Sequence, residues 1–124
     1  MKSGKHVILC IDDDATFRGL LRRLLEGEGY AVAEAATAED GLKQYRQVQP
    51  DLVIVDLMME EIDSGVSFVK EIKALGAKIP IYMLSGVGDT LNINVDYSKL
   101  GLTGVLQKPV EPRTLLATMA AKLK

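Results

Sequence analysis

The chain has 124 residues, and its 15 Lys and Arg residues against 17 Asp and Glu residues give a formal net charge of −2. This length fits one domain, and a hydrophobic content of 48% excludes a disordered chain. One cysteine and one histidine exclude a disulfide framework, a cysteine-based zinc site and a multi-histidine metal centre. The near-neutral charge argues against a nucleic-acid partner. No apolar stretch or signal peptide points to a membrane or to export, so we expect a cytoplasmic protein.

Short apolar runs alternate with amphipathic segments along the chain. In chain order, we predict a strand at residues 6–11, a helix at 14–28, a strand at 30–35, a helix at 38–47, a strand at 51–55, a helix at 64–75, a strand at 79–84, a strand at 103–106 and a helix at 111–123. Thr37 is a predicted N-cap, and Cys10 is expected to be a buried apolar side chain of the first strand. Residues 86–101 are poor in helix formers, so they predict only a short or distorted helix.

Polar side chains follow four of the predicted strands. They are Asp12 and Asp13 after the first strand, Asp56 after the third, Ser85 after the fourth and Lys108 after the fifth. Strands that alternate with helices predict a parallel sheet with helices on both faces, and such sheets bind ligands at the carboxyl ends of their strands. We therefore expect these side chains to meet at one edge of the sheet.

A cluster of carboxylates at this edge needs a cation, because two carboxylates about 4 Å apart repel by about 4 kcal/mol at an effective dielectric of about 20. Oxygen ligands without imidazole or thiolate favour Mg²⁺. The ammonium of Lys108 and the hydroxyl of Ser85 complete the set of groups that phosphoryl transfer to a carboxylate requires. The sequence therefore predicts a Mg²⁺ site beside a carboxylate that accepts a phosphoryl group.

With these residues in this order, the chain resembles a response-regulator receiver domain of two-component signalling, and it is similar to the single-domain chemotaxis receivers. The resemblance covers essentially the whole chain and rests on four motifs, which are Asp12-Asp13 after VILCI, Asp56 after LVIV, Ser85 after IYML and Lys108-Pro109 after GVLQ. It implies an α/β, flavodoxin-like, doubly wound sheet of five parallel strands in the order 2-1-3-4-5, with helices on both faces. It also implies a single receiver domain over residues 1–124 with no output domain.

The resemblance implies which residues hold the metal. Asp13 and Asp56 would ligate Mg²⁺ directly, together with the main-chain carbonyl of Met58. Asp12 would reach the metal through a water molecule.

The resemblance also implies a signalling switch and not an enzyme. Asp56 would accept a phosphoryl group from the phosphohistidine of a sensor histidine kinase. Lys108 would pair with Asp56 and then with the phosphoryl group, Ser85 would hydrogen-bond to a phosphoryl oxygen, and the Lys108-Pro109 peptide bond is often cis in the family. Phosphorylation would then change a face that binds a downstream protein or a second copy of the chain.

The chain departs from the family pattern in places that concern the interaction face. Val105 stands where the family usually has an aromatic switch residue, so a rotating ring cannot report phosphorylation here. Glu60 stands where a proline is usual, and the loop from there to Gly65 is slightly longer than usual. The chemistry is intact by residue type, and the face that meets the partner is atypical.

Two other interpretations stay open. The pattern Asp12-x-Asp14-x-Thr16 also resembles the first motif of haloacid-dehalogenase-type phosphatases, in which Asp12 would be the nucleophile and Asp14 the acid and base. Asp14 equally suits the N-cap of the helix that follows. The second interpretation is a receiver that is never phosphorylated and acts as a constitutive docking module.

Overall fold

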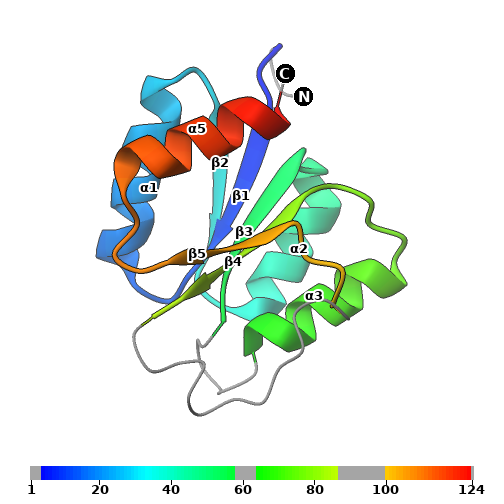
Figure 1. Ribbon diagram of the computed structural model, residues 1–124. Coiled ribbons are helices and arrows are strands. Elements are labelled where there is room, and N and C mark those ends of the chain that lie inside the picture. Colours follow the sequence, from blue (N-terminus) through cyan, green and yellow to red (C-terminus); the bar gives the residue numbers. More distant parts are fainter. Residues whose placement is uncertain (1–3, 58–63, 87–99, 124) are drawn as a thin grey trace.

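The computed structural model describes residues 4–57, 64–86 and 100–123 (Figure 1). Its elements are β1 (Val7–Ile11), α1 (Ala15–Gly27), β2 (Ala31–Ala35), α2 (Ala38–Val48), β3 (Leu52–Asp56), α3 (Ser64–Ala74), β4 (Ile81–Ser85), β5 (Gly104–Gln107) and α5 (Pro112–Lys122). All nine predicted elements are confirmed, and their ends differ from the predicted ones by at most two residues. The short or distorted helix predicted within residues 86–101 lies almost wholly outside the described residues.

The five strands form one sheet in the order β2-β1-β3-β4-β5, and every neighbouring pair is parallel. This confirms the predicted flavodoxin-like order. Because all strands run the same way, their carboxyl ends lie along one edge of the sheet (Figure 1). Cys10 pairs with Ile54 and Ile54 with Tyr82, so β1, β3 and β4 end at nearly the same level.

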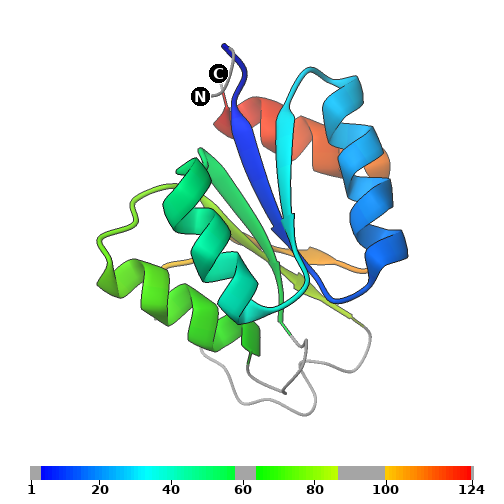
Figure 2. The ribbon, with the colours of Figure 1, turned by 180° about the vertical axis from the view of Figure 1, so that it is seen from behind.

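Two layers of helices enclose the sheet (Figures 1 and 2). Helices α1 and α5 cover one face, and α2 and α3 cover the other. Successive residues of β1 point to opposite faces, so Ile8 and Cys10 pack toward α1 and α5, and Leu9 and Ile11 pack toward α2 and α3. The continuous apolar run of the first strand is therefore explained by burial on both faces. None of the helices in the described ranges has both the length and the apolar character that a membrane crossing requires.

The first turns of α1 and α2 are held by side-chain caps. Asp14 Oδ1 accepts hydrogen bonds from the main-chain N–H groups of Thr16 (3.0 Å) and Phe17 (3.2 Å), at the start of α1. Thr37 Oγ1 accepts one from Asp40 N–H at 3.0 Å, which confirms the predicted cap of α2. Helix α1 therefore begins at a defined position directly after β1.

Cys10 provides a test of this packing. The side chain is fully buried in β1, and burial raises the pKa of the thiol to about 12. Since the thiolate is the reactive form, we expect the native protein at neutral pH to resist a thiol-specific chromogenic reagent, and the urea-unfolded chain to react completely. Cys10 is the chain's only cysteine, so the absorbance change reports this site alone. Rapid labelling of the native protein would contradict this description of the core.

Candidate functional site

The polar residues predicted to meet at the sheet edge do meet there. Asp12 and Asp13 follow β1, Asp56 and Ser85 are the last residues of β3 and β4, and Lys108 follows β5. One carboxylate oxygen from each of Asp12, Asp13 and Asp56 lies within 4.8 Å of the other two. Neighbouring parallel strands thus bring together acids that are far apart in the sequence.

The carboxylates differ in burial and share one ammonium. Asp12 and Asp56 are buried, whereas Asp13 is exposed. The Nζ atom of Lys108 lies 2.8 Å from Asp12 Oδ2 and 3.3 Å from Asp56 Oδ2. Burial by itself would lower the pKa of Lys108, but the hydrogen bonds and charges of these two acids outweigh it and raise the pKa above its ordinary value. Lys108 is therefore a cation at neutral pH.

The donor set fits Mg²⁺. Three carboxylates and one ammonium leave two negative charges at this edge, which a divalent cation neutralises. All side-chain ligands are oxygen atoms, which suit a hard cation. Asp12, Asp13 and Asp56 are the residues that could hold it. Met58, whose main-chain carbonyl was expected to contribute, lies outside the described residues.

Ser85 places a hydroxyl at the same edge. Its side chain is buried, and its Oγ has no hydrogen-bond partner within the described part of the chain. A buried hydroxyl without a partner costs about 1–3 kcal/mol, so this position favours an additional oxygen ligand. The N–H of Lys108 donates to the main-chain oxygen of Ser85 at 2.9 Å, and the Lys108-Pro109 peptide bond is cis, as the resemblance implied.

Lys108 has a further contact that the sequence analysis missed. Its ammonium lies 4.7 Å from the centre of the Phe17 ring, in the first turn of α1. Such cation–π contacts are worth about 0.5–1 kcal/mol at exposed sites and more when desolvated. The contact joins the residue after β5 to the helix after β1, and no spacing along the chain indicates it.

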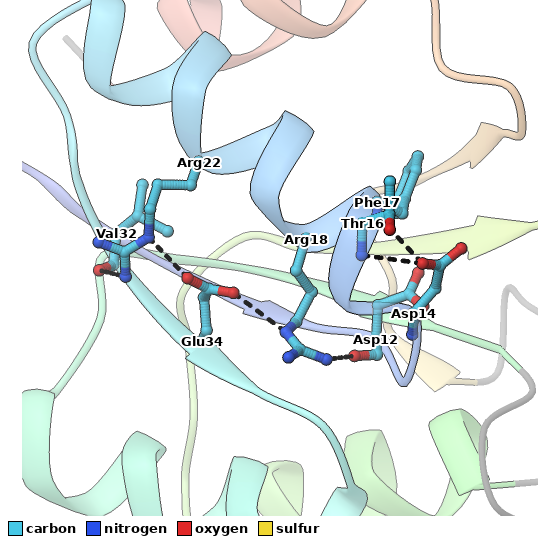
Figure 3. A network of polar contacts seen from close by, with 8 residues as sticks. All are labelled: Asp12, Asp14, Thr16, Phe17, Arg18, Arg22, Val32 and Glu34. Atoms are coloured by element: carbon cyan, nitrogen blue, oxygen red, sulfur yellow. Dashed lines mark hydrogen bonds and ion pairs between the residues drawn. The ribbon is translucent and has the colours of Figure 1, made fainter.

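A second missed feature is a network of charges beside the acidic edge (Figure 3). Glu34 of β2 accepts hydrogen bonds from Arg18 Nε at 3.0 Å and from Arg22 Nε at 2.6 Å. Arg18 Nη1 donates to the main-chain oxygen of Asp12, and Arg22 Nη2 donates to that of Val32. Burial by itself would raise the pKa of Glu34, but the hydrogen bonds from the two arginines lower it below its ordinary value. The two arginines lie four residues apart on α1 and so share one face, but nothing local pairs them with β2.

Asp14 serves as a helix cap. Its Oδ1 atom accepts the N–H groups of Thr16 and Phe17, and the side chain is exposed. Figure 3 shows this cap beside Asp12. The general-acid role that the phosphatase interpretation requires therefore competes with the capping of α1.

Known proteins resemble this chain in sequence and in fold. The family described as the response regulator receiver domain matches residues 8–120. The transcriptional regulatory protein ZraR of Salmonella typhimurium is 38% identical over 123 residues, which are 99% of this chain and 27% of that protein. The DNA-binding response regulator MtrA of Mycobacterium tuberculosis is 31% identical over 124 residues, which are 100% of this chain and 53% of that protein. The chain therefore spans about half or less of the length of these relatives.

Solved structures agree with the sequence comparison. A response regulator receiver domain protein from Clostridium thermocellum has a TM-score of 0.85 and 30% identity, over 95% of this chain and 94% of that one. The chemotaxis protein CheY4 of Vibrio cholerae has a TM-score of 0.81 and 28% identity, over 97% of this chain and 100% of that one. The chain belongs to the response regulator receiver domain family, the signalling modules of two-component systems.

A substitution at Gly65 can test how closely the backbone of Asp56 is packed. A Cβ atom at Gly65 would lie 2.2 Å from the main-chain oxygen of Asp56 and 2.8 Å from Leu57 Cα. Gly65→Ala should therefore lower the free energy of unfolding by about 1–3 kcal/mol, as overpacking does elsewhere. Urea unfolding of wild type and of the variant measures this loss of free energy of unfolding.

Gly19→Ala is the matched control, because a Cβ there meets no atom within 4 Å in the middle of α1. It should be neutral or stabilising by up to about 1 kcal/mol. Equal effects of the two substitutions would contradict the close approach of Gly65 to Asp56.

The Arg18, Arg22 and Glu34 network predicts a dependence of stability on pH. The folded protein holds the pKa of Glu34 below the ordinary value of 4.5, so the ionised carboxylate stabilises the fold above pH 4.5. That stability is lost as the pH falls from 4.5 through the lower folded pKa. We expect wild type to exceed Glu34→Gln in free energy of unfolding at neutral pH, and the difference to shrink in acid. Urea unfolding of both proteins at several pH values measures this difference in free energy of unfolding. A difference that does not vary with pH would contradict the stabilising role of the ionised Glu34 carboxylate.

Proposed function

We propose that the chain is a Mg²⁺-dependent phosphoacceptor in which Asp56 receives a phosphoryl group from a sensor histidine kinase. The proposal is carried by the meeting of Asp56, Asp13 and Asp12 with Lys108 at one edge of the sheet. In the transfer, an Asp56 oxygen attacks phosphorus, the bond between phosphorus and the kinase imidazole nitrogen breaks, and the imidazole leaves.

Asp56 is better suited to this role than Asp12. The carboxylate of Asp12 caps the turn after β1, since its Oδ1 accepts the N–H of Asp14 at 2.9 Å, and its Oδ2 lies 2.8 Å from Lys108 Nζ. Asp56 ends the central strand, next to Ser85 on β4 and within reach of the Lys108 ammonium. Lys108 and the Ser85 hydroxyl would contact the phosphoryl oxygens, and a bound Mg²⁺ would neutralise the charge that develops there.

The phosphoryl group would act on the surface formed by β5 and the start of α5. The group carries about −1.5 to −2 units of charge. It replaces the single charge of the Asp56 carboxylate and so would increase the negative charge beside Lys108. Drawing Lys108 toward Asp56 would change its contacts with Asp12 and Phe17, and Lys108 connects directly to Pro109 before α5. Val105 on β5 is exposed and apolar, which suits a contact with a protein. The partner would be a downstream protein or a second copy of this chain.

Several expectations stay predictions. A receiver without an output domain is one of them, and ZraR and MtrA are both longer than the segment they share with this chain. A cytoplasmic location and the lack of a nucleic-acid partner are others.

Labelling with a radioactive small acyl phosphate tests the proposal. We expect wild type to be labelled in Mg²⁺ and not in an excess of chelator, because the cation offsets the charge of the acids and of the donor. Asp56→Asn should abolish labelling, since the amide is no nucleophile. Asp14→Asn is the matched control, because asparagine also caps helices well, and it should leave labelling intact.

Each other outcome favours a different interpretation. Labelling lost in Asp14→Asn and kept in Asp56→Asn would favour the phosphatase interpretation. A folded wild type that takes up no label would favour the constitutive docking module.

A further inference from the structure

We propose that Arg18 is a positioning residue for the acidic edge. Its guanidinium, anchored on Glu34, holds the main-chain oxygen of Asp12 and thereby aims the Asp12 and Asp13 carboxylates at a shared cation. This inference rests on the proposed Mg²⁺ site.

Asp12 is held at four points. Its N–H donates to Ala35 O at 3.1 Å, its Oδ1 accepts the N–H of Asp14, and its Oδ2 lies 2.8 Å from Lys108 Nζ. The fourth contact, from Arg18 to the carbonyl oxygen, is the one that bears on the next residue. That oxygen belongs to the peptide group between residues 12 and 13, and a peptide group is planar.

The plane of this peptide group sets the direction of Asp13. Asp13 is exposed, and no hydrogen bond or ion pair holds its side chain within the residues described. The position of its carboxylate therefore depends on the backbone that leads into it. By holding the Asp12 carbonyl, Arg18 sets the orientation of the peptide group that leads to Asp13.

The anchor of Arg18 is itself rigid. Its Nε and Nη1 atoms, on one planar group, bind Glu34 and the Asp12 carbonyl, and its side chain is only 16% exposed (Figure 3). Arg22 holds the other oxygen of Glu34 and the main-chain oxygen of Val32 on the same strand. The guanidinium of Arg18 is thus tied to the edge strand β2 on one side and to the acidic edge on the other.

Geometry and charge predict opposite effects of removing Arg18. Loss of a positive charge near an acidic cluster would by itself tighten cation binding. Loss of the bond to the Asp12 carbonyl would weaken it, because the two carboxylates no longer start from the correct orientation. The sign of the change in Mg²⁺ affinity therefore separates a positioning role from a purely electrostatic one.

Arg22→Gln is a matched control that the chain itself supplies. Arg22 binds the same Glu34 carboxylate, and it also forms an ion pair with Glu26 at 3.2 Å on α1. None of its contacts with Glu34, Glu26 and the Val32 main-chain oxygen reaches Asp12. Arg18→Gln and Arg22→Gln thus remove the same charge from the same network, and only the first releases the Asp12 carbonyl.

The experiment is a calorimetric titration of the purified chain with Mg²⁺, paired with urea unfolding of each variant. We expect Arg18→Gln to weaken Mg²⁺ binding by about 10–100-fold, the range typical of groups that orient metal ligands. Arg22→Gln should lose stability and keep the wild-type affinity. Arg18→Lys keeps the charge but replaces the planar group that presents Nε and Nη1 to the two acceptors by a single nitrogen on a flexible stem, so it should weaken binding too. It also serves as the test if Arg18→Gln fails to fold.

Two results would overturn the inference while the proposed site stands. One is unchanged or tighter Mg²⁺ binding in both Arg18 variants when wild type binds Mg²⁺, and the other is an equal loss of affinity in Arg22→Gln. A wild type that binds no Mg²⁺ would instead overturn the proposed site, and the inference with it.

Discussion

The mutual repulsion of three carboxylates at one edge of a parallel sheet is the constraint from which the chemistry of this domain follows. Asp12 and Asp13 come from β1 and Asp56 from β3, and they lie within 4.8 Å because these strands are hydrogen-bonded neighbours. Lys108 compensates one of the three negative charges, and a divalent cation would compensate the other two. The repulsion that remains at this edge is what further positive charge would relieve.

Burial of the central strands holds the framework on which these polar contacts are built. Strands β1, β3 and β4 are buried along their whole length, with apolar layers on both faces of the sheet. The edge strand β2 is only partly buried, and this leaves room for Glu34 among alanines and valine. A charged side chain that binds two arginines fits at such an edge and would be costly in the centre of the sheet. The network of Arg18, Arg22 and Glu34 therefore approaches the acidic edge from β2.

The helices, the strands and the acidic edge were predictable because they depend on periodic signals, whereas the strand order came from the family resemblance. Apolar runs of strand length identified the sheet, and the chain order of Asp12, Asp56, Ser85 and Lys108 placed their side chains at the ends of parallel strands. The contacts of Arg18 were not predictable, because α1 alone presents it as a polar residue on a helix face. Its partner Glu34 lies 16 residues further on, and they meet only once the crossover from β1 through α1 to β2 has formed.

The absence of an aromatic residue at position 105 changes where a signal can travel. Lys108 is in contact with Asp12, Asp56 and the Phe17 ring, so one ammonium links the acidic edge to the first turn of α1. Any charge added at Asp56 competes with Asp12 for that ammonium. A displacement of Lys108 would change its contact with the Phe17 ring of α1 and would move the chain that leads from Lys108 into α5. In the proposed switch, a receiver with valine on β5 would thus have a route from its acidic edge to its surface that needs no rotating side chain.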